Sequence, residues 1–329
     1  MIAEGQGASM PSVDLRRGLY PAVPVFHRAD GRLHGLAQAR YVDWIAGQAV
    51  GGVAVWSAMG RGLLLSDESR GEVLKSWRNG LGPRQILIAG AGSTTRERHP
   101  DRVIESARSM AQTASDGGAD AILVHPPTAF RGRAEVDNLT IAYHAAIGDV
   151  GLPMIVTYLD EAAGGIAYRP HVLAQLVAKP EVLGLNIATL NSVMTFQDIT
   201  ALMRHLAPAT PIVTGETRFL GYSLMAGAEA AIHGMASACT RLQAEFLSAF
   251  WAGDATDFLI RNRAIDELAR HTFLGPIEGA TQRILWCLVH QGVITAEAAH
   301  DPWAPRMGGR EFEQIGECLR SMGELQSNI

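Results

Sequence analysis

Eight short apolar segments recur along the chain at intervals of roughly thirty residues. Each is too short for a helix and lacks a clean alternation of apolar and polar residues. In most cases Gly, Pro or Ser residues follow, and then a longer amphipathic segment. Strands that are buried on both faces of a parallel sheet have this character. The predicted strands span residues 20–26, 51–56, 85–90, 121–125, 153–158, 182–187, 211–215 and 230–235.

The segments between these strands predict helices. Ser66 can cap a helix whose first turn contains Asp67 and Glu68, and residues 101–115 place apolar side chains at helical spacing. Eight strand–helix units in one register predict an α/β fold, the (β/α)8 TIM barrel. A doubly wound open sheet is the alternative, but it rarely contains eight such strands. No Gly-rich dinucleotide fingerprint follows the first predicted strand either.

The chain divides into three predicted parts. Residues 1–17 are polar and rich in Gly and Ser, which predicts a flexible N-terminal tail. Residues 18–238 contain the predicted barrel. Residues 239–329 contain amphipathic helical segments without further strands, and they predict a C-terminal helical extension.

Composition favours a small-molecule partner. The chain has 329 residues and a net charge of −5, and both signs of charge are mixed along it, so no basic stripe indicates nucleic acid or a membrane surface. No run of eighteen apolar residues and no secretion signal occurs. Cys239, Cys287 and Cys318 are odd in number and far apart, which fits neither a disulfide framework nor a zinc cluster. We therefore expect reduced thiols and a cytoplasmic location.

Seven local segments resemble, in order and spacing, the dihydrodipicolinate synthase / N-acetylneuraminate lyase family. These segments are GLYPAVPVFHRADGRL (18–33), IAGAGS (88–93), DGGADAILVHPP (116–127), LPMIVTYLD (152–160), PEVLGLNIAT (180–189), PIVTGE (211–216) and GAEAAIHGMAS (227–237). The resemblance extends from Gly18 to about Leu325. It implies a barrel with a three-helix C-terminal extension, no cofactor, and a homotetramer or homodimer.

The resemblance does not extend to the family's Schiff-base lysine. In the family, a lysine at the end of strand six forms an imine with a 2-oxo acid, and a tyrosine at the end of strand five shuttles protons. The resemblance aligns the tyrosine with Tyr158 and the lysine with Asn186. The chain has two lysines: Lys75 falls on a predicted outer helix, and Lys179 lies roughly 23 Å from Asn186 along an extended strand. Because a carboxamide nitrogen has no free electron pair for imine formation, we expect no Schiff base.

Three further family positions differ in this chain. The threonine pair that grips the substrate carboxylate in the family falls at Ala58 and Met59. The carboxylate-binding arginine falls at Ala163, and the relay tyrosine, which usually crosses a dimer interface, falls near Thr128. Together with Asn186, these departures predict a rebuilt pocket.

The carboxyl ends of the predicted strands supply four candidate catalytic residues, because chemistry in such barrels occurs at that end. Tyr158 is predicted to transfer protons or stabilise an oxyanion, and Asn186 to orient a carbonyl or hydroxyl group. His125 and Glu216 could form an acid–base pair across the mouth. The structural alternatives are an aromatic plug for Tyr158, a space-filling relic for Asn186, a loop cap for His125, and an ion pair with an arginine for Glu216.

A second set of polar and bulky residues is predicted to bind the substrate. Arg61 and Arg218 are candidate anion anchors, although most arginines at strand ends form ordinary ion pairs. Met59 together with Trp56 suggests a larger or more apolar substrate than pyruvate, or merely core filling. The full predicted set is Ser57, Met59, Arg61, Asp160, Gly215, Arg218 and His233.

The leading functional hypothesis is a lyase that acts on a small oxo- or hydroxy-carboxylate without a Schiff base, with turnover that depends on Tyr158. Aldol cleavage, dehydration and hydration all require stabilisation of an enolate or oxyanion, so the sequence does not separate them. One alternative is a catalytically inactive relative that binds a metabolite or a partner. Another is a metal-assisted lyase or hydrolase that uses His125, Asp160, Glu216 and His233, but no dense ligand motif supports it, and no metal is predicted.

Overall fold

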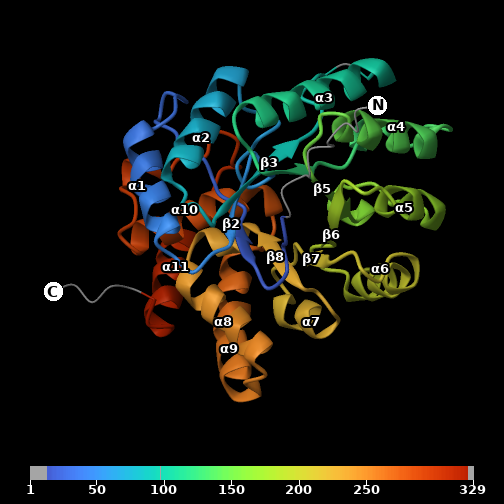
Figure 1. Cartoon of the computed structure of the whole chain (residues 1–329). Coiled ribbons are helices and arrows are strands. Elements are labelled where there is room, and N and C mark those ends of the chain that lie inside the picture. The colour runs from blue at the N-terminus through green and yellow to red at the C-terminus, as the bar shows by residue number, and fades with distance from the viewer. Residues whose placement is uncertain (1–12, 97, 325–329) are drawn as a thin grey trace, which may run out of the picture.

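Eight parallel strands form the barrel that the apolar segments predict. The structure, a computed structural model, describes residues 13–96 and 98–324. Neighbouring strands pair in the order β1-β8-β7-β6-β5-β4-β3-β2, and a bridge between Ala22 and Ala54 connects β1 to β2 (Figure 1). The strands are β1 (Leu19–Pro21), β2 (Gly52–Val55), β3 (Ile86–Ala91), β4 (Ala121–Val124), β5 (Met154–Leu159), β6 (Val182–Ala188), β7 (Ile212–Thr214) and β8 (Ala230–His233).

A helix follows each strand and covers the outside of the barrel. The hydroxyl of Ser66 caps α2 by accepting from the backbone N–H of Ser69 at 3.1 Å, as predicted. Helix α3 buries Val103, Ala107 and Met110 on the stripe that faces the strands. The outer helices are α1 (Gly35–Ala46), α2 (Asp67–Gly80), α3 (Pro100–Asp116), α4 (Val136–Gly148), α5 (Pro170–Val177), α6 (Val193–Leu206), α7 (Leu220–Met225) and α8 (Thr240–Ala252).

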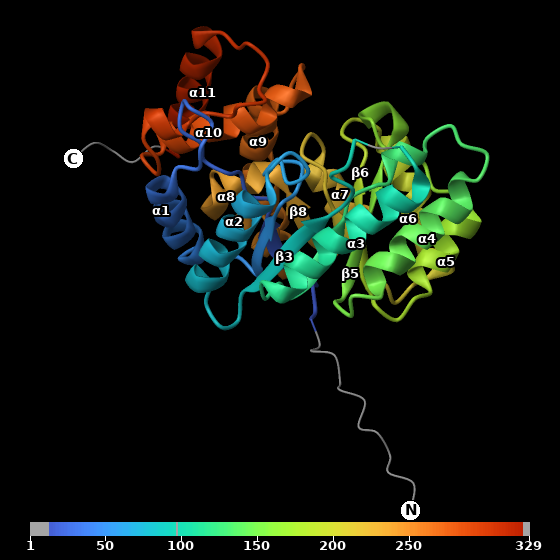
Figure 2. The same ribbon diagram turned by 90° about the horizontal axis from the view of Figure 1, so that it is seen from above.

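The C-terminal extension consists of α9 (Ala255–Thr272), α10 (Ala280–His290) and α11 (Gly309–Ser321) in the described part of the chain. Figure 2 shows these three helices gathered on one side of the barrel. Helix α10 contacts the short 3-10 turn Gly234–Ser237 that follows β8. The sequence places the start of the extension at residue 239, but α8 is the eighth helix of the strand–helix repeat, so the extension proper begins after Gly253.

Part of the segment predicted as a flexible N-terminal tail packs against the barrel. Residues 1–12 lie outside the described residues. Leu15, however, is buried in the core, and the backbone N–H of Arg17 donates to the carbonyl oxygen of Glu229 at 2.7 Å. Residues 13–17 are therefore part of the barrel, because the apolar side chain of Leu15 gains free energy by packing near Gly184.

Two further observations concern the state of the cysteines and the possibility of a membrane-spanning helix. Cys239, Cys287 and Cys318 are free and buried. Within residues 13–96 and 98–324, no helix has the length and apolar character needed to span a bilayer.

Candidate active site

A cavity of about 330 Å³ opens at the carboxyl ends of the strands. Strand ends and the loops after them form its floor and walls, and residues around the start of α10 cover it, including Phe273, Ile277 and Thr281. Most of the lining is apolar, and a few polar groups point into it. The polar lining residues are Ser57, Arg61, His125, Thr157, Asn186, His233, Glu278 and Thr281.

Three buried polar side chains of this cavity have no hydrogen-bond partner. They are Asn186 through Oδ1, Thr157 through Oγ1, and His233 through both ring nitrogens. All three residues are less than a tenth exposed. An unpaired buried polar group costs about 1–3 kcal/mol, so three of them around one cavity indicate a place for a polar ligand.

The pairing of β5 with β6 decides which side chains face the cavity. Thr157 lies opposite Asn186, and Tyr158 lies opposite Ile187. Successive side chains of a strand point to opposite faces, so Thr157 shares the inner face with Asn186. Tyr158 does not line the cavity; its ring packs edge-to-face on Tyr168, with 6.0 Å between centroids.

This arrangement corrects the prediction that Tyr158 shuttles protons at the mouth. Between Met154 and Ile155 the partner residue on β6 moves from Val182 to Gly184, so the irregularity adds one residue to β6 and leaves β5 regular. Alternation along β5 then puts Thr157 and Leu159 on the face that lines the cavity and Tyr158 on the other face. The resemblance places a tyrosine near the end of strand five, but it does not determine which of Thr157 and Tyr158 points inward.

His125 lies in the cavity wall as a neutral imidazole. Its Nε2 is 2.9 Å from the carbonyl oxygen of Trp56, which can only accept, so Nε2 carries the proton and Nδ1 is an acceptor. Burial lowers the pKa of His125, and this favours the neutral form. Gly90 leaves room for the ring, because a Cβ at that position would lie 2.8 Å from Nε2.

His233 is the most deeply buried ionisable group of the cavity. Burial lowers the pKa of its imidazole to about 3, so the ring is neutral near pH 7 and offers one donor and one acceptor. His125, Asn186 and His233 follow or belong to β4, β6 and β8. Alternate strands of a barrel contribute side chains to the same layer, so these three groups face one space from three sides.

Glu216 does not face His125 across the mouth, contrary to the predicted acid–base pair. Its carboxylate accepts from the backbone N–H of Thr189 at 2.5 Å and from that of Leu190 at 3.1 Å. Leu190 has a positive φ of 64°, which costs a non-glycine residue about 1–2 kcal/mol. Glu216 therefore holds the loop after β6, the strand that carries Asn186, in its strained conformation.

The ionisation of Glu216 makes stability depend on pH. Burial raises the pKa of its carboxyl group to about 7, which two backbone N–H bonds only partly oppose. The folded state thus binds a proton that the unfolded state releases at its ordinary pKa of about 4.5. The stabilising contribution is complete below about pH 4.5 and is lost as the pH rises through about 7.

We expect the unfolding free energy of the wild type to fall, relative to Glu216→Gln, by on the order of 2–3 kcal/mol as the pH rises through this window. Urea unfolding at a series of pH values measures it. The comparison uses the slopes of unfolding free energy against pH for the two proteins, since glutamine at position 216 also changes one hydrogen bond to the backbone of the loop. Parallel profiles would show that the carboxyl group titrates normally.

Arg61 lines the cavity, but its guanidinium is already paired. Its Nη2 lies 2.6 Å from Oδ2 of Asp301 and donates to the carbonyl oxygen of Glu278 at 2.6 Å. The carboxylate of Asp301 is 2% exposed, so the ion pair is largely buried. Arg61 therefore links the loop after β2 to the C-terminal extension. Its guanidinium is not the free anion anchor that the sequence predicts.

Two further predicted binding residues lie outside the cavity lining. Arg218 turns toward the extension, where its Nη1 donates to the carbonyl oxygen of Ala269 at 3.4 Å. Asp160 caps the short turn after β5 by accepting from the backbone N–H of Ala162 at 2.8 Å. Each side chain thus bonds to a backbone group outside the cavity lining. The partner of Asp160 lies in the turn after β5, and the partner of Arg218 lies on α9.

The remaining predicted binding residues, Ser57, Met59, Gly215 and His233, do line the cavity. A Cβ on Gly215 would lie 3.1 Å from Oδ1 of Asn186, so the glycine leaves space beside the amide. No group of three or more His, Cys, Asp or Glu side chains among the described residues is placed to hold a metal ion. The metal set considered from the sequence is dispersed, because Asp160 and Glu216 face backbone N–H groups.

Neither lysine lines the cavity. Lys75 lies on α2, outside the barrel. Lys179 precedes β6 and lies 3.7 Å from the carboxylate of Glu181, at the amino end of the strands and opposite the mouth. The residues of β6 that line the cavity are Asn186 and Ala188.

Sequence reasoning missed Thr157 and the cover formed by Phe273, Ile277 and Thr281. Counting alternate residues from Asn186 across the strand pairing would have found Thr157, but only with the register known. The cover residues carry no local sequence signal, because they reach the mouth only through the packing of the extension.

The comparison with known proteins identifies the family. The pattern of the Dihydrodipicolinate synthetase family matches residues 15–311. The chain belongs to this family. A 4-hydroxy-tetrahydrodipicolinate synthase of Acidiphilium cryptum (strain JF-5) is 27% identical over 238 residues, which cover 72% of this chain and 76% of the relative.

Solved structures of the dihydrodipicolinate synthase fold agree with the barrel and its extension. YagE, a prophage protein of the family from E. coli K12 in complex with pyruvate, has a TM-score of 0.80 at 19% identity and covers 93% of this chain and 98% of its own. The Ruminococcus gnavus sialic acid aldolase has a TM-score of 0.79 at 18% identity, with coverage of 94% and 98%. At these identities the structures show the fold, and the family match shows a protein of the lyase and aldolase class.

Proposed function

We propose that this family member is a lyase that acts on a small oxo- or hydroxy-carboxylate through hydrogen bonds and proton transfer, without a Schiff base. One observation carries the proposal: Asn186 occupies the inner face of β6 beside two other unpartnered polar groups, Thr157 and His233, in a cavity that neither lysine lines. The mostly apolar remainder of the lining favours a substrate with carbon substituents beyond its carboxylate.

In this proposal Asn186 donates a hydrogen bond to the substrate, and an imidazole transfers the proton. The amide nitrogen of Asn186 donates a hydrogen bond to the oxygen on which negative charge develops. A neutral imidazole, His233 or His125 through Nδ1, accepts the substrate proton. In an aldol cleavage the proton leaves the hydroxyl group, the carbon–carbon bond breaks, and its electron pair becomes an enolate. The same imidazolium then returns the proton to carbon.

A panel of 2-oxo and hydroxy acids tests the proposal with purified protein. Release of an aldehyde or keto product, detected by coupled dehydrogenase assay or by NMR, supports a lyase. Saturable binding of a panel member without any product would instead indicate a catalytically inactive relative.

Reductive trapping tests the absence of the imine separately. Treating the wild type with pyruvate and borohydride should leave its intact mass unchanged, because neither Lys75 nor Lys179 lines the cavity. Asn186→Lys is the matched control, since it places an amine on the inner face of β6 and should gain the reduced pyruvate adduct. A wild-type adduct mapped by peptide mass to Lys75 or Lys179 would contradict the mechanism.

A further inference from the structure

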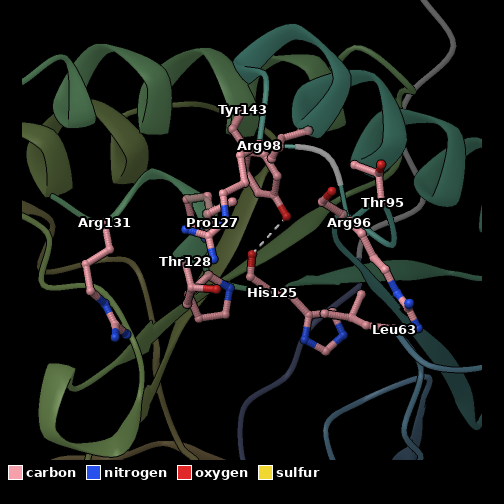
Figure 3. Close-up of a pocket in the computed structure, with 13 residues that line it drawn as sticks. Leu63, Thr95, Arg96, Arg98, His125, Pro127, Thr128, Arg131 and Tyr143 are labelled. Atoms are coloured by element: carbon pink, nitrogen blue, oxygen red, sulfur yellow. Dashed lines mark hydrogen bonds between the residues drawn. The ribbon is translucent and has the colours of Figure 1, made fainter. Parts of the chain in front are cut away.

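A second cleft, of about 480 Å³, adjoins the mouth cavity on the side of β3 and β4. The loops after these two strands form it, together with Tyr143 of α4. His125 and Pro126 line both spaces and form the wall between them. Figure 3 shows three arginines among the cleft residues, with Arg98 between Arg96 on one side and Arg131 on the other. We call this site the arginine cleft.

The charge of the arginine cleft is positive in its described lining. Arg96, Arg98 and Arg131 line it, and no aspartate or glutamate does so among the residues that the structure describes. The guanidinium groups of Arg96 and Arg98 are exposed and form no ion pair within the described chain. Arg131 donates through Nη2 to the carbonyl oxygens of Gly164 and Gly165, which fixes its position and leaves its other nitrogens available.

Hydroxyl groups and a rigid wall complete the cleft. The Oγ of Ser93 is buried and has no hydrogen-bond partner. The hydroxyl of Tyr143 donates to the carbonyl oxygen of His125 at 3.1 Å and ties α4 to the loop after β4 (Figure 3). Pro126 and Pro127 restrict the backbone of that loop. An unsatisfied hydroxyl donor on a preformed wall is a second feature, besides the charge, that suits an acceptor-rich ligand.

We propose that the arginine cleft is a binding site for an oxyanion, a phosphate or carboxylate group. Guanidinium groups bind such groups with paired, charge-assisted hydrogen bonds. The one guanidinium in the described lining of the mouth cavity, that of Arg61, is already paired with Asp301, whereas Arg96 and Arg98 form no ion pair within the described residues. The common wall of His125 and Pro126 places an anion bound there beside the candidate active site.

Titration of the whole protein with inorganic phosphate tests this site without any turnover, so the outcome does not depend on the proposed reaction. Phosphate binding, followed by calorimetry at low ionic strength, should be saturable, and its Kd should rise about tenfold in Arg98→Ala. Arg96→Ala should act in the same direction. Arg263→Ala is the matched control, because Arg263 is an exposed arginine on α9 that forms no ion pair with the described residues, and this variant should bind as the wild type does.

Two further measurements identify the preferred oxyanion and check that each variant is folded. Malonate in place of phosphate tells which oxyanion the site prefers, and competition between the two shows a single site. Circular dichroism and the Tm of each variant confirm folding; Arg96 and Arg98 are chosen because, unlike Arg131, their side chains hold no backbone in place. Phosphate binding that is absent, or equally strong in Arg96→Ala, Arg98→Ala and Arg263→Ala, would overturn the site.

Discussion

Replacing Asn186 by alanine should lower kcat/KM for the substrate found in the acid panel by about 10²–10³-fold, the usual loss when one oxyanion donor is removed. Asn186 is buried and lines the cavity, and its side chain forms no hydrogen bond within the described residues, so its amide nitrogen can donate to a ligand oxygen. Steady-state kinetics measures the loss. A fall in kcat with unchanged KM would place the amide's contribution in the transition state.

Two substitutions on β5 serve as matched controls for the Asn186 variant. Thr157→Val should lower kcat/KM by about tenfold, because its hydroxyl lies on the same inner face. Tyr158→Phe should change it by less than about twofold, because the ring lies outside the cavity and packs on Tyr168. The reverse order, with Tyr158→Phe the more damaging, would show that β5 presents its other face to the substrate.

Removing Asp301 should destabilise the protein by about 3–5 kcal/mol. Asp301→Ala leaves the guanidinium of Arg61, only 17% exposed, without the carboxylate 2.6 Å away. The desolvation penalty of the buried charge then remains uncompensated. Because the pair joins the loop after β2 to the segment after α10, hydrogen exchange should also quicken in the extension. Urea unfolding measures the change in free energy.

The double variant Arg61→Leu/Asp301→Leu separates the charge effect from lost packing. Removing both charges together should recover much of the stability, since a buried ion pair often contributes little compared with apolar residues of similar size. Glu267→Ala on α9, which removes partly exposed contacts with Arg270 and His271, is the control and should cost less than about 1 kcal/mol. Equal losses in Asp301→Ala and Glu267→Ala would show that burial does not strengthen the Arg61 pair.

The barrel could be predicted from the chain because its signals are local. Each apolar run is long enough for one buried strand, and most are followed by turn residues and an amphipathic segment, as with Ser66 and the helix that it caps. The absence of a lysine near the end of strand six is likewise a fact of composition, because the chain has only Lys75 and Lys179. Neither conclusion requires knowledge of how distant segments meet.

The direction of each side chain at the mouth was decided by tertiary structure. Whether Thr157 or Tyr158 faces the cavity depends on how β5 lies beside β6, where Thr157 pairs with Asn186 and Tyr158 pairs with Ile187. Glu216 accepts a hydrogen bond from the backbone of Leu190, and Arg61 forms an ion pair with Asp301. Both partners lie far away in sequence. The pattern of residues along the chain thus determined the strands, the helices and the positions of the two lysines, whereas hydrogen bonds and ion pairs between distant segments determined which polar groups remain free to meet a ligand.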